Sequence, residues 1–396
     1  MGEWKTYHLD EVYDFASGLS KGRDEFGFGF PFLSFMDVFN NFFVPQELQQ
    51  LANTSELERS RCSVKRGDVF LTRTSETQED LGMSCVALKD YPDTTFNGFT
   101  KRLRPRSTTE IVPEYVGFYF RSPRFRAEVT SMSSVTTRAS LNNEMLSALK
   151  VIAPPADEQW AIADVLIRLN EKIDLLHRQN KTLEAMAETL FRQWFVEEAE
   201  VQSDTQIEMD NLVDSVSITH KFPDPQVVFL NTSDIYLGDV LKHESENVKS
   251  LPGQAKKSIC KDDILFSEIR PANGRYAYID FDAKNYVVST KLMVLRSKGV
   301  HSQAFVYFYL THPMTVTWLQ TLAEGRSGTF PQITFDQIRR LKISVQSKEL
   351  FDSATLLCES WLQKIKFNQK QIRSLEKLRD TLLPKLMSGE VRVQYD

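Results

Sequence analysis

The chain has 396 residues, of which 41% are hydrophobic and 26% charged, which is typical of a globular protein with length for about two or three domains. Its net charge of −5 excludes a chain that is basic overall, so any contact with nucleic acid needs local positive charge or a partner that supplies it. No apolar run approaches the roughly 20 residues that span a bilayer. The four cysteines have neither a C-x-x-C nor a zinc spacing, so we expect reduced thiols, no metal and a cytoplasmic location.

Residues 1–153 are expected to form a first mixed domain made mostly of strands. Short apolar runs such as Val69-Phe70-Leu71 alternate with turn residues, as strands and their connections do. Arg and Lys neutralise phosphates, and Arg, Asn, Gln and Ser read base edges. The candidate DNA contacts of this domain are Lys21, Arg73, Lys101, Arg102, Arg104, Arg106 and Arg138. A short basic run can equally be solvated surface, and that alternative stays open.

Residues 154–197 are expected to form a long central helix. Its apolar positions follow steps of four and three residues, at Ile162, Leu166, Leu169, Ile173, Leu176, Asn180, Leu183, Ala187, Leu190 and Trp194. No Pro or Gly interrupts the run after Pro154-Pro155. This is the pattern of a coiled coil, and it leaves an apolar seam that needs a partner helix.

Residues 198–346 are interpreted as an acidic linker and a second domain that repeats the first. Leu237-Gly238-Asp239-Val240 resembles Leu9-Asp10-Glu11-Val12, and Asp262-Asp263-Ile264-Leu265 resembles Gly67-Asp68-Val69-Phe70. Basic and polar residues recur in its expected loops. Its candidate DNA contacts are Lys256, Lys257, Arg270, Asn273, Arg275, Arg326 and Gln332.

Residues 347–396 are expected to form a second long helix and a tail. The same repeat runs from Ala354 to Leu386, and Ser347 and Gly389 suit the two helix ends. Because corresponding blocks recur at a nearly constant separation, the chain is a tandem duplication of a globular domain followed by a long helix.

The seam of each long helix contains one asparagine, Asn180 in the first and Asn368 in the second. A buried amide is costly unless it is paired. In an antiparallel pair, setting Asn180 opposite Asn368 also sets Ile162 opposite Leu386 and leaves no overhang. We therefore predict that the two asparagines meet and set the register of the helices.

The sequence contains no recognisable catalytic constellation. Gly27-Phe28-Gly29 lacks the third glycine of a dinucleotide fingerprint, and there is neither a phosphate-binding P-loop nor the N/D-P-P-Y/F motif of amino-methyltransferases. The six histidines have no metal-ligand spacing. We expect a chain without catalysis of its own.

The order and duplication of these blocks resemble the specificity (S) subunit of type I restriction–modification systems. The similarity rests on the domain openings, on the blocks at Gly67-Asp68-Val69-Phe70 and Asp262-Asp263-Ile264-Leu265, and on the helix run from Pro154 to Ala163. The end from Leu382 to Glu390 looks like the family's C-terminal region. The sequence departs from its own repeat at Asp262, where the first half has Gly67.

The resemblance implies an α+β fold, in which two β-rich mixed target-recognition domains are separated by two long antiparallel helices that form a coiled coil with pseudo-two-fold symmetry. It implies recognition of a bipartite site on double-stranded DNA. It also implies two methyltransferase (M) subunits that methylate adenine with S-adenosylmethionine, and restriction (R) subunits that use ATP and Mg, with no cofactor in this chain. The alternatives are a self-contained DNA methyltransferase and a coiled-coil scaffold without a DNA role.

Overall fold

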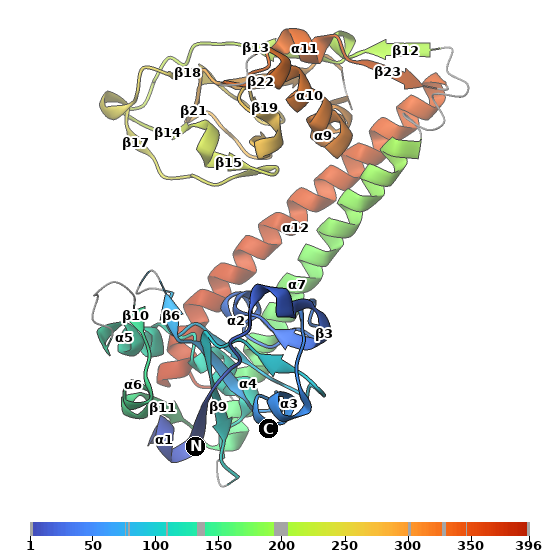
Figure 1. Ribbon diagram of the computed structural model, residues 1–396. Helices are drawn as coiled ribbons and strands as arrows, with labels where there is room; N and C mark the ends of the chain where they lie inside the picture. The colour runs from blue at the N-terminus through green and yellow to red at the C-terminus, as the bar shows by residue number, and fades with distance from the viewer. Residues whose placement is uncertain are drawn as a thin grey trace. The chain divides into compact units, whose positions relative to one another are not determined.

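The structure, a computed structural model, describes residues 3–393 except 76, 78–79, 108–109, 133–138, 194–204, 300–301, 327–329 and 346. The chain divides into two units. Unit 1 comprises Met1–Asp174 and Arg373–Asp396, and unit 2 comprises Leu175–Ile372. Figure 1 shows that each unit combines a globular part with a segment of each long helix.

The central sheet of unit 1 is antiparallel and four-stranded. In the order β2-β9-β5-β7 its strands are Tyr13–Ser17, Thr100–Pro105, Val69–Thr72 and Ser84–Val86. A second sheet has the order β4-β3-β8, with strands Leu51–Ala52, Phe26–Leu33 and Thr95–Phe96. Two short pairs join β1 (Lys5–His8) to β11 (Lys150–Ala153) and β6 (Thr74–Ser75) to β10 (Ala139–Ser140). Strand β5 is buried along its whole length, as its β-branched and aromatic residues favour.

Short helices cover these sheets. They are α1 (Leu9–Val12), α2 (Phe35–Asn40), α3 (Glu56–Arg61), α4 (Pro113–Tyr119), α5 (Pro123–Met132) and α6 (Asn143–Ala148), with a 3-10 turn, η1, at Arg23–Glu25. The side chains of Ser34 and Ser55 cap α2 and α3 by accepting the N–H groups of Asp37 and Glu58. A cluster of buried aromatic residues on α4 and α5 forms much of the core.

Unit 2 repeats this plan with variations. One sheet has the order β13-β22-β19-β20, with strands Val213–Val216, Leu292–Ser297, Ile264–Ser267 and Tyr276–Tyr278. The other has the order β17-β14-β21-β18, with strands Glu246–Asn247, Gln226–Leu230, Tyr286–Ser289 and Ala255–Ser258. The short pairs are β12 (Thr205–Glu208) with β23 (Lys342–Val345) and β15 (Ile235–Tyr236) with β16 (Asp239–Val240). The helices are α9 (Ser302–Thr311), α10 (Pro313–Arg326) and α11 (Phe335–Arg339), with 3-10 turns η3 (Met209–Asn211), η4 (Thr232–Asp234), η5 (Val248–Ser250) and η6 (Pro271–Asn273).

The predicted duplication is visible in the strand pairings. The order β13-β22-β19 matches β2-β9-β5, and the pair β12–β23 matches β1–β11. Gly67 and Asp262 begin the same turn, and both have a left-handed backbone, with φ of 86° and 71°. Aspartate enters this region more readily than most residues, so the turn keeps its shape without the glycine.

The two long helices are α7 (Ala156–Arg192) and α12 (Lys348–Ser388). Ser347 caps α12, since its Oγ accepts the N–H of Leu350, as the sequence predicts. Pro384 lies inside the last turns without ending the helix, which stops before Gly389, where φ is 76°.

Within each unit the segments of α7 and α12 pack mostly through their predicted seams. In unit 1, Ile162 and Leu166 share a core with Leu386, but Leu383 is buried in place of the predicted Leu382, which is only partly buried. In unit 2, Leu362 is likewise buried in place of the predicted Trp361. In unit 2, the Nδ2 group of Asn368 donates to Asn180 Oδ1 at 2.8 Å, which confirms the predicted register. Toward the end of α7, the buried seam residue is Phe191, and Leu190 is only partly buried. Trp194, the last predicted seam position, lies outside the described residues. No helix within the described ranges is long and apolar enough to cross a membrane.

Candidate nucleic-acid interface

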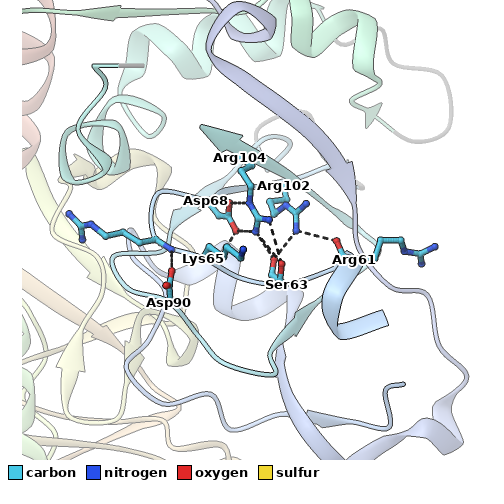
Figure 2. A network of polar contacts seen from close by, with 8 residues as sticks. Arg61, Ser63, Lys65, Asp68, Asp90, Arg102 and Arg104 are labelled. Atoms are coloured by element: carbon cyan, nitrogen blue, oxygen red, sulfur yellow. Dashed lines mark hydrogen bonds and ion pairs between the residues drawn. The ribbon is translucent and has the colours of Figure 1, made fainter. Parts of the chain in front are cut away.

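The basic run from Lys101 to Arg106 forms strand β9 and the residue that follows it, and is not a loop. Figure 2 shows how its central cations are used. Arg104 makes a two-pronged ion pair with the fully buried Asp68, through Nε to Oδ1 at 2.7 Å and Nη2 to Oδ2 at 2.6 Å. Arg102 donates to the carbonyl of Ser63 at 2.7 Å and is 7% exposed. These two side chains connect β9 to the segment before β5. Because their hydrogen-bond donors are used in this structural role, few remain to contact DNA.

Two other predicted cations of unit 1 also have acidic partners. Arg106 pairs with Asp14 at 3.0 Å on the exposed side of β9. Lys21 pairs with Glu25 at 3.1 Å and with Glu58 at 2.9 Å, and only 12% of its side chain is exposed. Their charges are compensated inside the chain, which weakens the case for phosphate contact.

Arg73 and Lys101 have a different environment. The Nζ group of Lys101 donates to Ser17 Oγ at 3.0 Å and to Asn143 Oδ1 at 2.8 Å, both neutral acceptors. The Nε atom of Arg73 is buried and has no hydrogen-bond acceptor. Arg138, the last candidate of this unit, lies outside the described residues.

In unit 2, Lys257 and Arg275 serve the domain's own backbone. The Nζ group of Lys257 donates to the carbonyls of Thr290 and Leu292, at 3.1 and 2.8 Å. Burial lowers the pKa of this lysine. The guanidinium of Arg275 donates to the carbonyls of Ser233 and Ile235.

Exposed candidates of unit 2 gather where β19 ends. The segment after β19 pairs with the segment before α11 through a bridge between Ile269 and Gln332, next to a hydrogen bond from the Arg270 N–H to the Pro331 carbonyl at 3.1 Å. This brings Arg270 beside Gln332, while Asn273 follows in the turn η6. Arg270 and Asn273 are exposed and Gln332 is half-buried. We call Arg270, Asn273 and Gln332 the strand-end surface of unit 2.

The remaining candidates are less informative. Lys256 is exposed on β18, away in sequence from the strand end. Arg326 is the last residue of α10, and its side chain lies outside the described part of the structure.

The same connection exists in unit 1, where β6 follows β5 and pairs with β10. The N–H of Leu141 donates to the carbonyl of Arg73 at 2.8 Å, and that of Ile333 to the carbonyl of Glu268 at 2.9 Å, so the two connections are equivalent. Both units therefore present polar side chains at the same place in the fold.

Sequence reasoning missed two residues beside the strand end of unit 1. Phe99 is 59% exposed just before β9, and Asn143 accepts from Lys101. Period-two spacing from Lys101 could have found Phe99, because alternate residues of a strand share a face. Asn143 comes from α6, and no local pattern connects it to β9.

The fold defines a protein of two units that repeat one plan of strands and helices. The described residues contain no cluster of three or more metal-ligating side chains. Residues 1–185 and 223–349 match the family described as type I restriction modification DNA specificity domain, and the chain belongs to that family.

Relatives carry the same description. The chain is 43% identical over 159 residues to the type I restriction enzyme HindI specificity subunit of Haemophilus influenzae, a match that covers 40% of this chain and 35% of that one. It is 22% identical over 425 residues to the MjaIX specificity subunit of Methanocaldococcus jannaschii, covering 99% and 94%. Among solved structures, the type I S subunit from M. genitalium has a TM-score of 0.63 at 15% identity, covering 97% and 96%, which shows that the fold is shared.

Proposed function

We propose that this chain is the DNA-specificity subunit of a type I restriction–modification complex, and that each unit reads one half of a bipartite site. The observation that carries the proposal is that the same connection recurs in both units. In unit 1, the segment after β5 pairs with the segment before α6. In unit 2, the segment after β19 pairs with the segment before α11. Because the two units share this connection but have different side chains on it, each unit can recognise a different half-site.

The strand-end surface of unit 2 has the chemistry for base readout. Arg binds guanine through two hydrogen bonds, and Asn and Gln bind adenine in the same manner. Arg270 and Asn273 are exposed to reach a groove, and Arg270 has a left-handed backbone with φ of 45°. A strained conformation of this kind is kept where the surrounding structure holds it, often at binding sites.

The long helices offer a surface for protein partners. In unit 2, Leu356 and Phe367 are each 55% exposed and lie about three turns apart on α12, and Met186 on α7 is 45% exposed. Exposed apolar residues aligned on one helix face suit a packed protein interface. We assign this surface to the two M subunits, which would supply adenine methylation with S-adenosylmethionine. R subunits would supply ATP- and Mg-dependent chemistry.

The test is DNA binding and methylation by the full chain with and without its M partner. We expect weak, poorly selective DNA binding by the chain alone, for two reasons. Its net charge is −5, and candidate cations such as Lys21, Arg104 and Arg106 already form ion pairs with acidic residues of the same chain. With the M partner we expect tight binding and methylation of a two-part motif. Nanomolar specific binding by the chain alone at physiological salt, or methyl transfer without a partner, would contradict the proposal.

A further inference from the structure

Two cations on one face of the central sheet of unit 1 have no acidic partner among the described residues. Strand β5 pairs with β9 so that Leu71 faces Lys101, and the Arg73 N–H donates to the Phe99 carbonyl at 2.9 Å just beyond the strand end. Facing residues and alternate residues of antiparallel strands share a face. Arg73, Phe99 and Lys101 therefore project from the same side of the sheet.

Both cations have hydrogen-bond donors without an acceptor in the described part of the chain. An ammonium group has three donors, and Lys101 gives two of them to Ser17 and Asn143. The Nε donor of Arg73 is buried without an acceptor, which is costly for a polar group. An anion that contacts both half-buried side chains would accept the third Lys101 donor and the Nη donors of Arg73.

The two cations also disfavour each other. Burial, and then the nearby charge of Arg73, lower the pKa of Lys101. A guanidinium beside an ammonium is an effective binder of phosphate oxygens, since charge-assisted hydrogen bonds are short and strong. Phe99, 59% exposed on the same face, adds an apolar surface. A sugar or base attached to the phosphate could cover that surface, whereas a free phosphate ion would leave it exposed.

The equivalent place in unit 2 is built differently. The hydrogen bond from the Glu268 N–H to the Lys291 carbonyl takes the place of the one from Arg73 to Phe99. Glu268 and Lys291 form an ion pair at 4.0 Å, and Met293 faces Phe266 where Lys101 faces Leu71. In the described structure, the uncompensated cation pair belongs to unit 1.

We propose that Arg73 and Lys101 together bind one phosphate group of the DNA backbone at the half-site read by unit 1. This inference rests on the DNA-recognition role proposed above. A phosphate contact carries no sequence information but sets the register of a protein on the duplex. Arg73 and Lys101 are thus positioning residues for the base-reading side chains of the same unit.

The test measures the salt dependence of DNA binding by the reconstituted complex of the full chain with its M partner. Each phosphate neutralised contributes about 0.9 to the slope of log affinity against log salt concentration. The double variant R73Q/K101Q should bind the same motif with a slope less steep by about 0.9. The charge-preserving variants R73K and K101R should keep the wild-type slope.

Arg106→Gln is the matched control, because Arg106 follows the same strand but is paired with Asp14. Its slope should equal that of the wild type. An unchanged slope in R73Q/K101Q, or an equal loss in R106Q, would overturn the assignment. A loss of about 1.8 in the double variant would mean two separate phosphates and would overturn the shared site.

Neutral methylphosphonate links in the DNA locate the contact. Neutral links in one half-site should weaken binding of the wild-type complex and leave the double variant unaffected, while links in the other half-site should weaken both equally.

If inorganic phosphate stabilises the full chain against heat and R73Q/K101Q abolishes this without altering the DNA slope, the site binds a free anion and the DNA assignment is wrong. If the wild-type complex does not prefer its motif over random DNA, the recognition role itself fails.

Discussion

At the scale of single residues, both units contain an arginine–aspartate ion pair at the same position, in which the aspartate is fully buried. Asp68 and Asp263 are both fully buried, and each accepts two hydrogen bonds from an arginine, Arg104 or Arg296. Each aspartate also accepts the backbone N–H three residues before it, at Lys65 or Cys260. These aspartates anchor the turn that enters the central strand and connect it to the neighbouring strand.

Replacing Asp68 with Asn should strongly destabilise unit 1, because Arg104 would keep a partly buried charge without a carboxylate. Removing one partner of a buried pair costs about 3–5 kcal/mol, and we expect the lower end because 27% of the Arg104 side chain is exposed. Urea unfolding of the full chain measures this. The control is Asp14→Asn, whose pair with Arg106 is exposed and should contribute less than about 1 kcal/mol. Equal effects of the two substitutions would show that the buried pair has no special weight.

At the scale of elements, the seam of the long helices contains a buried asparagine pair that the duplication does not repeat. In the duplicated sequence, Leu176 corresponds to Asn368 and Ile372 corresponds to Asn180. Both Leu176 and Ile372 are buried and apolar. Asn368 is fully buried and donates to Asn180, but its own Oδ1 has no partner. We therefore expect the pair to lower stability relative to an apolar seam and to specify the register, which is the best-attested use of a buried asparagine in a coiled coil.

Replacing both Asn180 and Asn368 with Leu should stabilise the full chain against urea, whereas either single replacement should destabilise it by about 1–3 kcal/mol by leaving one amide unpaired. Register is read by oxidative crosslinking of cysteines introduced at Leu176 and Ile372. The crosslink should form readily with the asparagines present and less completely in the double Leu variant. A double variant that is less stable than both single variants would refute this account.

At the scale of the whole molecule, the first and last strands of each globular part pair with each other. Strand β1 pairs with β11 just before α7, and β12 pairs with β23 just before α12. Each globular part is thereby closed at its own ends, which suits it to act as an exchangeable reader of DNA.

Exchanging residues 1–153 for the corresponding part of a homologue should change one half of the methylated motif and leave the other half intact. The donor should not have proline at position 112, because the backbone N–H of Val112 donates to Gln159 Oε1 at 2.8 Å. Mapping methylated adenines in cells that carry the complex measures the outcome. A change in both halves would show that the two readers are not independent.

The sequence by itself determined the duplication, the two long helices and the register of their seam. These features depend on periodic spacing along the chain, and a buried asparagine can be satisfied in few registers. Tertiary structure alone decided which cations lack an acidic partner among the described residues. Arg102 and Arg104 are used internally because the folding of β5 and its preceding turn brings Asp68 and the Ser63 carbonyl against β9. Arg73 and Lys101, distant in sequence, share a face only because β5 pairs with β9. The charge of a basic residue is evident in the sequence, but its partner is set by contacts between distant segments.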